Sequence, residues 1–414
     1  MTTALTGSLP ETAKRESRIG TMTPVVLLGG GANALSVARS LGRLGATVRV
    51  INEPGAFVQY SRYSTPLDVP AKPGDEARAW AEYLLGPQGQ ALAGSVLLTC
   101  CDAGLELIAE HRESLSRRFL LDDSNPRAQV RMLGKLETYE DAVAAGVPTP
   151  AFRIVGSVDE VDAAREGLLF PVIVKPRLSH VFESRTGRKL FVADTVDAMA
   201  GAVAAIESTG TESIVMEMIP GGDDLLCSYY TYLDEDSRPL FHFTKRIIRR
   251  YPLLQGTACY HMTDWIPEAA ELGERLFRHV GLRGLANVEF KRDPRDGRLK
   301  LIECNARFTA SNCLVAHSGI DLAAFAYNRL TGRPLPPTAT FRQGVRLWDP
   351  IRDFQAYRAL SREGRLSFAC WLKGVIHPQS FPYFSWTDPL PALARLSKPL
   401  RDRIGTPQKT RRAP

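Results

Sequence analysis

The sequence predicts a chain of mixed class, with an open α/β unit first and a larger α+β region after it. Three observations predict this. Strand, turn and helix patterns alternate over residues 22–130, whereas paired strands predominate beyond them, one pair forming a hairpin. The chain is also long enough for two or three domains with sizeable cores, since it has 414 residues, 44% of them hydrophobic and 23% charged.

The α/β unit opens with an apolar strand at residues 25–28, a glycine turn, leucines and alanines at helical spacing, and a second strand at residues 47–51. The stretch "SVLLTCCDAGLELIAEH" adds another strand and helix. We therefore expect a small open α/β domain over residues 22–130. Residues 1–21 lack the apolar centre of a signal peptide, so we expect a disordered tail there.

The glycine turn leaves two interpretations open. Gly29, Gly31 and Ala34 resemble a dinucleotide fingerprint, and Glu53 stands about 20 residues on, where a ribose-binding acid would follow. Close packing at a strand-to-helix turn requires the same glycines. A dinucleotide-dependent oxidoreductase is therefore the alternative function from a different class.

The α+β region begins with a helix over residues 135–145 that ends at Gly146 and leads through two prolines into a strand. The stretch "LFPVIVKPRL" follows as a buried strand that delivers Lys175 at its end. Further along, "SIVMEMIPGGDDLLCSYYTYL" reads as strand, turn and strand. The stretch "LANVEFKRDPRDGRLKLIECNARF" predicts a hairpin with the turn "DPRDGR".

The second strand of this hairpin carries three polar side chains on one face, Glu303, Asn305 and Arg307. The hairpin can place Glu289 beside Glu303, and two like charges side by side destabilise a sheet. A cation between them resolves the conflict, and two carboxylates with an amide suit Mg²⁺ or Mn²⁺. Arg307 points the same way and suits a phosphoryl group. The plainer interpretation is a solvated hairpin face with an ordinary Arg–Glu pair.

The segments "GKLETYEDAVAAGVPTP", "FPVIVKP", "VMEMIPGGDD", "LANVEF" and "LIECNAR", in this order, resemble the ATP-grasp superfamily of carboxylate–amine ligases and carbamoyl phosphate synthetase-like enzymes. The resemblance covers about residues 22–335. It implies a Rossmann-like precursor domain at 22–130 and a two-subdomain ATP-grasp fold at 131–335, divided near 215 and 216. Residues 336–414 would be a C-terminal extension with a basic tail.

The resemblance also implies a nucleotide site. Lys135 and Lys175 would hold the ATP phosphates, and Glu217 would take the adenine amine. Backbone groups of Met218 and Ile219 would complete the hinge between the subdomains. Asp224 would hold the ribose hydroxyls, although relatives often have glutamate there and Asp223 competes for the role.

By the same resemblance, Glu289, Glu303 and Asn305 would ligate Mg²⁺ and Arg307 would stabilise the transferring phosphoryl group. The family often has a glycine-rich lid after the lysine strand. In this chain residues 177–187 contain a single glycine, Gly187. Side chains such as Ser179, His180 or Arg185 would therefore act on phosphate instead.

A basic stretch, "HFTKRIIRRYPLLQG", indicates the substrate region. We predict that Lys245 contacts phosphate and that Arg250 binds a substrate carboxylate, because a planar guanidinium matches a carboxylate in two bonds. Four basic residues on one strand and its loop cannot all face the site, and the alternative is that two or three of them are solvated.

These expectations predict an ATP-dependent ligase that activates a carboxylate as an acyl phosphate and joins it to an amine or thiol in biosynthesis. The same-class alternative is a bicarbonate-using carboxylase or carbamoylating enzyme. We expect small-molecule carboxylate and amine partners, with a homo-oligomer left open. Nucleic acid is not expected, because the net charge of +7 gathers mainly in the C-terminal tail. No apolar run suits a membrane, and seven scattered cysteines indicate the cytoplasm.

Overall fold

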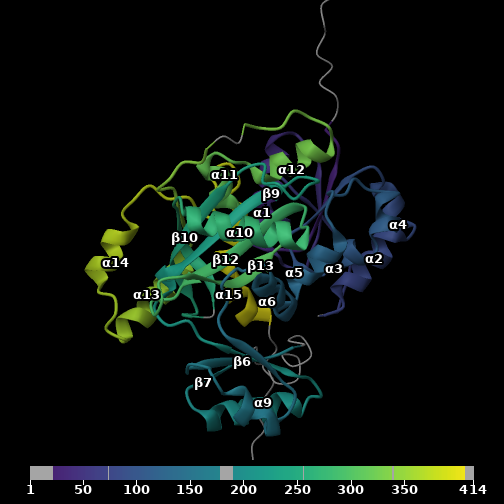
Figure 1. Cartoon of the computed structure of the whole chain (residues 1–414). Helices are drawn as coiled ribbons and strands as arrows, with labels where there is room; N and C mark the ends of the chain where they lie inside the picture. Colours follow the sequence, from purple (N-terminus) through teal and green to yellow (C-terminus); the bar gives the residue numbers. More distant parts are fainter. Residues whose placement is uncertain (1–21, 73, 178–189, 255, 338–339, 406–414) are drawn as a thin grey trace, which may run out of the picture.

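The computed structural model describes residues 22–72, 74–177, 190–254, 256–337 and 340–405, and places the strands of this part in three sheets. A four-stranded sheet and a six-stranded sheet share the main body, and a second four-stranded sheet projects below it (Figure 1). Residues 179, 180 and 185, which we predicted to act on phosphate, lie outside the described residues.

The N-terminal sheet is parallel, with the strand order β3-β2-β1-β4. Its strands are β1 (Val25–Leu28), β2 (Val48–Ile51), β3 (Thr65–Leu67) and β4 (Val96–Thr99). The helices of this unit are α1 (Ala32–Arg43), α2 (Glu76–Leu85), α3 (Asp102–Glu110) and α4 (Arg112–Ser116), with the short turns η1 (Phe57–Tyr60) and η2 (Gln88–Leu92). β1 and the first three turns of α1 are buried, as their apolar sequences require.

The glycines after β1 allow two backbone segments to approach each other. Gly29 and Gly30 have positive φ angles of 61° and 91°. A Cβ at Gly29 would lie 2.2 Å from the Cys101 Sγ, and one at Gly30 would lie 2.5 Å from the Cys100 Cβ. Close packing of this turn against the end of β4 therefore explains the glycine run without a dinucleotide.

The central sheet is antiparallel, with the order β13-β12-β9-β10-β11-β14. Its strands are β9 (Leu226–Leu233), β10 (Phe243–Tyr251), β11 (Thr257–Thr263), β12 (Gly284–Arg292), β13 (Leu299–Asn305) and β14 (Arg346–Trp348). One face packs on α5 (Pro126–Leu133), α6 (Lys135–Ala144) and α10 (Pro267–Val280). The other face packs on α1, α11 (Asn312–Ser318) and α12 (Leu322–Leu330). The N-terminal unit thus shares a core with the central sheet.

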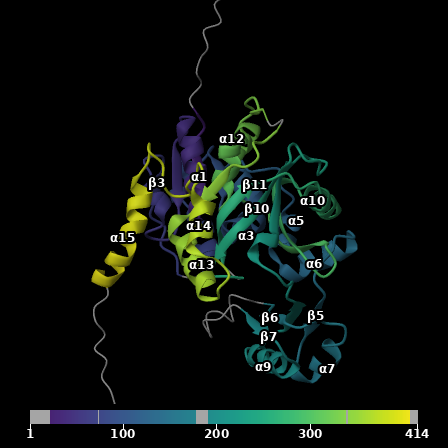
Figure 2. The same cartoon turned by 90° about the vertical axis from the view of Figure 1, so that its left-hand side faces the viewer.

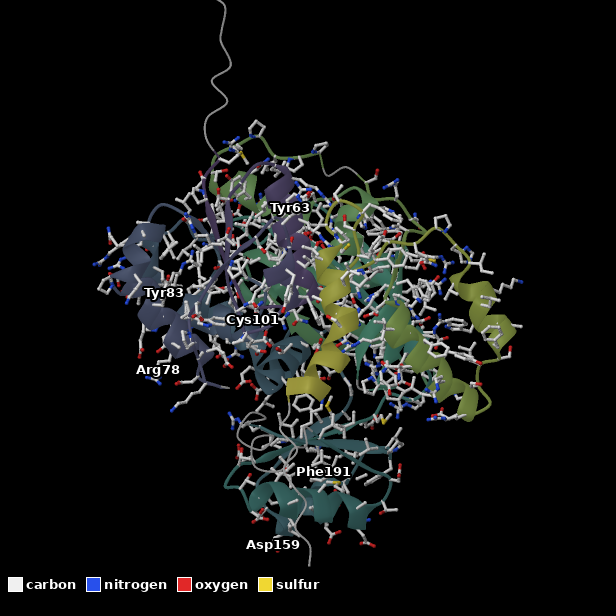
Figure 3. All side chains as sticks on the ribbon, turned by 180° about the vertical axis from the view of Figure 1, so that it is seen from behind. Tyr63, Arg78, Tyr83, Cys101, Asp159 and Phe191 are labelled. Atoms are coloured by element: carbon white, nitrogen blue, oxygen red, sulfur yellow. The ribbon has the colours of Figure 1, made fainter. Side chains whose placement is uncertain are left out.

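The small sheet has the order β5-β8-β6-β7 and a hydrophobic core of its own. Its strands are β5 (Phe152–Val155), β6 (Val172–Pro176), β7 (Phe191–Ala193) and β8 (Ser213–Glu217), and its helices are α7 (Val161–Ala164) and α9 (Val196–Glu207), with η3 (Val158–Glu160). Figure 3 shows this unit from behind, with Phe191 on the sheet and Asp159 at the far end. The chain then enters the central sheet through η4 (Asp223–Leu225).

The C-terminal segment returns to both sheets of the main body. α13 (Pro350–Arg362) and α14 (Phe368–Val375) lie at the β10 side, and α15 (Leu390–Gly405) runs beside the N-terminal unit near η1 (Figure 2). The buried Arg39 side chain donates to Asp388 at 2.9 Å and so ties this segment to α1. The C-terminal extension therefore packs over the main body. No helix in the described ranges is both long and apolar enough to cross a membrane.

Candidate active site

A cavity of about 610 Å³ lies where the central sheet, the start of α1 and the C-terminal segment meet. It collects six of the predicted site residues: Lys245, Arg250, Glu289, Glu303, Asn305 and Arg307. These residues come from β10, β12, β13 and the segment directly after β13. The fold therefore brings together side chains that lie up to 62 positions apart in the sequence.

The predicted pair of carboxylates is formed by the register of the β12–β13 hairpin. Glu289 pairs directly with Glu303, and a register shift follows between Glu289 and Phe290. Burial, and then the charge of Glu303, raise the pKa of the Glu289 carboxyl, while Lys245 and Arg250 lower it. The register prediction is confirmed, and two carboxylates held side by side favour a neighbouring cation.

The polar atoms around this pair fit a hard cation. Asn305 lies beside Glu303, with its amide nitrogen 3.4 Å from the Glu303 Oε1, and the Ser228 hydroxyl donates to the Glu289 Oε1 at 3.4 Å. Among the described residues no three His, Cys, Asp or Glu side chains gather closely enough to hold a metal. Two carboxylates and an amide suit an ion such as Mg²⁺, which usually keeps waters and shares its coordination with phosphate.

The two predicted phosphate-binding lysines lie near Glu303 and come from other elements. Lys135 begins α6, and its Nζ lies 3.6 Å from the Glu303 Oε2. Lys175 lies near the end of β6 in the small sheet. Burial, and then the charge of Lys135, lower the pKa of Lys175 to about 7, although Glu303 raises it. Protonation of the Lys175 amine is thus costly at this position. A nearby anionic ligand, such as a phosphate, would offset that cost.

Lys245 is 1% exposed and rests on a histidine that the sequence analysis missed. Its Nζ lies 3.2 Å from the His261 Nδ1, and the His261 Nε2 lies 3.0 Å from the Ala258 carbonyl. Burial, and then the Lys245 charge, hold the pKa of His261 well below its usual value. The imidazole is therefore neutral. It donates from Nε2 and accepts at Nδ1 from the Lys245 Nζ, which holds this side chain in the wall of the cavity.

The comparisons with known proteins agree with this geometry. Residues 268–337 match the family model for the carbamoyl-phosphate synthase L chain, ATP binding domain. A D-aspartate ligase of Enterococcus faecium (strain Aus0004) is 27% identical over 370 residues, which cover 83% of this chain and 86% of the relative.

Two solved structures share the fold. Biotin carboxylase from Campylobacter jejuni, in a β-γ-ATP complex, has a TM-score of 0.61 and 15% identity over 79% of this chain and 75% of that one. An L-amino acid ligase from Bacillus licheniformis has a TM-score of 0.58 and 14% identity over 79% of each chain.

These similarities support the ATP-grasp superfamily for this chain. The remaining predicted contacts concern the nucleotide and the substrate. In three of them, some of the predicted groups already have partners within the chain.

The first of these contacts involves Glu217, which is 6% exposed at the end of β8. Its Oε1 accepts from the Leu169 backbone N–H at 2.9 Å, and its Oε2 accepts from the Arg295 Nη2 at 2.8 Å. A buried carboxylate needs such partners, so both oxygens of the Glu217 side chain are engaged in the described geometry, and the contact of this residue with the adenine amine stays a prediction. Only its backbone carbonyl stays a candidate. Arg295 lies in the hairpin turn, and nothing in the sequence linked it to Glu217.

The hinge backbone is also partly engaged. The Met218 N–H donates to the Pro171 carbonyl at 3.0 Å, and the Ile219 carbonyl accepts from the Lys291 Nζ at 2.8 Å. The adenine contacts predicted for these two residues therefore narrow to the Met218 carbonyl and the Ile219 N–H.

The third contact involves Arg250 and the two aspartates of η4. The Arg250 Nε donates to the Asp223 Oδ1 at 2.7 Å, and the two side chains are 15% and 9% exposed. Asp223 is thus already engaged, which favours Asp224, exposed on the same turn, for the ribose contact. Arg250 acts electrostatically on Lys175 and Glu289. Its guanidinium is thus engaged by Asp223, and its predicted contact with a substrate carboxylate stays a prediction.

Arg307 faces the cavity and is held from the N-terminal unit. Its Nε donates to the Asp102 Oδ1 in the first turn of α3. Nearby, the Asn33 Nδ2 donates to the carbonyls of Cys100 at 2.7 Å and Phe308 at 2.9 Å. These contacts join β4 and α1 to the end of the Glu303 strand, so the N-terminal unit forms one wall of the site.

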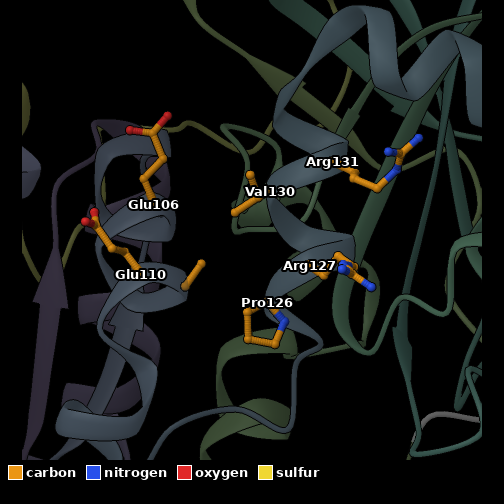
Figure 4. Close-up of a pocket in the computed structure, with 7 residues that line it drawn as sticks. Glu106, Glu110, Pro126, Arg127, Val130 and Arg131 are labelled. Carbon is orange, nitrogen blue, oxygen red and sulfur yellow. The ribbon is translucent and has the colours of Figure 1, made fainter.

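A larger hollow, of about 910 Å³, lies between α3 and α5. Figure 4 shows Pro126 and Val130 turned toward the helix that carries Glu106, and Arg131 turned away. Arg131 is paired with Asp141 at 2.8 Å. This hollow lacks the paired carboxylates and lysines of the ATP-grasp site, so size alone does not identify the functional cavity.

Proposed function

We propose that this protein is an ATP-dependent carboxylate–amine ligase that activates an amino acid as an acyl phosphate and joins it to an amine. The observation that carries the proposal is the Glu289–Glu303 pair with Lys135 and Lys175 near Glu303, in a fold shared with ATP-grasp enzymes. The similarity to a D-aspartate ligase over most of both chains supports an amino acid as substrate. The likeness to a biotin carboxylase, at 15% identity, concerns the fold alone.

In the proposed reaction the small sheet and the central sheet hold ATP between them. Lys135 and Lys175 bind its phosphates, and Glu289, Glu303 and Asn305 hold Mg²⁺. The metal would supply charge neutralisation for the phosphates. The N-terminal sheet would belong to the Rossmann-like precursor domain. This domain would contribute Asn33 to the wall of the cavity, where the phosphoryl acceptor binds. All seven cysteines are free thiols, which fits the reducing cytoplasm that we propose.

The chemistry proceeds in two balanced steps. An oxygen of the substrate carboxylate attacks the γ-phosphorus in line, the bond to the β-phosphate oxygen breaks, and ADP leaves. Arg307 and Lys245 stabilise the charge that develops on the transferred group. The amine then attacks the acyl carbon, phosphate leaves with its electron pair, and the amine loses a proton. A closed site must exclude water, which would otherwise hydrolyse the acyl phosphate.

The proposal is tested with ATP, Mg²⁺ and a panel of amino acids, with hydroxylamine as a surrogate amine. A ligase of this kind should release ADP and phosphate and form a hydroxamate with at least one acid. Release of AMP and pyrophosphate, or ATP hydrolysis with no dependence on any acid, would contradict it.

A further inference from the structure

The active-site cavity carries more positive charge than its two carboxylates balance. Five cationic side chains line it: Lys245, Arg250, Arg307, Arg352 and Arg395. Three of these are paired elsewhere, Arg250 with Asp223, Arg307 with Asp102 and Arg395 with Asp349. Lys245 rests on the neutral His261 and acts on Glu289. The remaining cation, Arg352, comes from the C-terminal segment.

Arg352 lies in the first turn of α13 and is partly buried. Its backbone N–H donates to the Asp349 Oδ1 at 3.4 Å. Within the described ranges, no hydrogen bond or ion pair engages its guanidinium. The side chain lines the main cavity and also an adjoining pocket of about 40 Å³. The Asp349 carboxylate also lines the adjoining pocket, but it is paired with Arg395 at 2.7 Å. The Arg352 guanidinium therefore suits an anionic group of a ligand.

The helix that carries Arg352 is fixed by a buried network at the next residue. The Asp353 carboxylate is fully buried and accepts two bonds from Arg249, at 2.6 Å and 2.9 Å. It also accepts from the indole N–H groups of Trp348 and Trp371, each at 2.9 Å. Four donors on one carboxylate hold the start of α13 on β10, so Arg352 is presented by a rigid element.

The surroundings of Arg352 lie away from the carboxylate pair. The adjoining pocket includes Tyr383 and His261 but neither Glu289 nor Glu303. The Arg395 guanidinium lies 4.1 Å from the centre of the Tyr383 ring and closes this end. Gly31 faces the same space, because a Cβ there would meet only the Tyr383 hydroxyl, at 3.9 Å. The cavity thus has two cationic ends, one beside Glu289 and Glu303 and one at Arg352.

We propose that Arg352 binds a second carboxylate of the acid substrate, so that the enzyme acts on a dicarboxylic amino acid. One carboxylate reacts beside Lys245, and the other forms paired hydrogen bonds with the Arg352 guanidinium. This inference rests on the proposed ligase function and reassigns to Arg352 the contact that the sequence suggested for Arg250. Specificity would then depend on the C-terminal segment, outside the region that carries the family motifs.

The test compares Arg352→Gln with Arg358→Gln, a matched loss of charge at an exposed position on the same helix. Hydroxamate formation is measured with D- and L-aspartate and with D- and L-glutamate, at saturating ATP and Mg²⁺. Arg352→Gln should raise the KM for the preferred acid about 10- to 100-fold, as expected for a lost charge-assisted hydrogen-bonded pair. The KM for ATP should stay within about twofold. Arg352→Lys keeps the positive charge but loses the planar guanidinium. Its KM for the acid should lie between those of the wild type and Arg352→Gln.

An equal KM for the acid in Arg352→Gln and Arg358→Gln would overturn the inference while leaving the ligase function intact. A wild-type preference for amino acids with one carboxylate would also overturn it. If no acid supports turnover, the ligase function fails, and thermal shift with the same acids still decides the subsite. Stabilisation by aspartate or glutamate that Arg352→Gln abolishes would support the subsite, and no stabilisation of the wild type would refute it.

Discussion

Lys175→Met should make the protein without nucleotide more stable and at the same time weaken ATP binding. The Lys175 ammonium is held where burial and Lys135 lower its pKa from 10.5 to about 7. At pH 7 this fall corresponds to a destabilisation of at most about 5 kcal/mol, since each pKa unit is worth about 1.4 kcal/mol. The side chain is partly accessible to water, so we expect a gain of about 1–2 kcal/mol from Met.

The sign of the pH dependence follows from the direction of the shift. Between pH 7 and pH 10.5 the unfolded chain binds more protons at Lys175 than the folded chain does, so wild-type stability rises with pH across this window. The advantage of Lys175→Met should therefore be full below pH 7 and shrink toward pH 10. Thermal unfolding followed by circular dichroism at several pH values measures it, and calorimetric titration with ATP measures the loss of affinity.

Lys300→Met is the control of opposite sign. The Lys300 Nζ lies 2.7 Å from Asp293 and 3.1 Å from Asp296, and its pKa is raised. Its removal should destabilise the hairpin, because it leaves the buried Asp293 carboxylate with one partner fewer. A Lys175→Met protein that is less stable than the wild type at pH 7 would refute the argument that this ammonium lacks a compensating anion.

Three further predictions concern the Glu289–Glu303 pair, the buried contact between Asp353 and Arg249, and the nucleotide. Glu303→Gln should stay folded and melt no lower than the wild type, because like-charge repulsion with Glu289 is relieved, yet lose at least about 100-fold in hydroxamate formation; unchanged turnover would contradict the metal assignment. Asp353→Asn should lower stability by about 3–5 kcal/mol in denaturant unfolding, since the buried Arg249 loses its counter-charge; a change below about 1 kcal/mol would count against this. ATP with Mg²⁺ at 100 times Kd should add about 2.7 kcal/mol, measured by thermal shift with and without a chelator, and an equal shift in both would argue against metal-dependent binding.

The sequence predicted those parts of the site that depend on local periodicity and on hairpin register. Glu303 and Asn305 alternate along β13, and a polar turn placed Glu289 opposite Glu303. Arg307, which we predicted on the same strand, lies just beyond its end. These relations hold within about twenty residues of chain, where strand pleat and turn geometry fix which side chains meet.

The parts that the sequence did not predict depend on contacts between distant segments. Glu217 meets Arg295 because the small sheet docks on the hairpin turn, and Arg352 reaches the cavity because Asp353 binds Arg249 on β10. A buried carboxylate with four donors looks, in sequence, like any aspartate in the first turn of a helix. Long-range pairing of this kind is decided by the packing of whole sheets, which no local pattern contains.

The most direct test of the central claim is the fate of the oxygens of the substrate carboxylate. The acid that supports the fastest ADP release is labelled with ¹⁸O in its carboxylate groups, and the reaction is run with ATP, Mg²⁺ and hydroxylamine. Mass spectrometry of the released phosphate then shows where the labelled oxygen goes. An acyl phosphate predicts one ¹⁸O atom in each phosphate and one lost from the acid. Unlabelled phosphate, or ¹⁸O in AMP, would contradict the account.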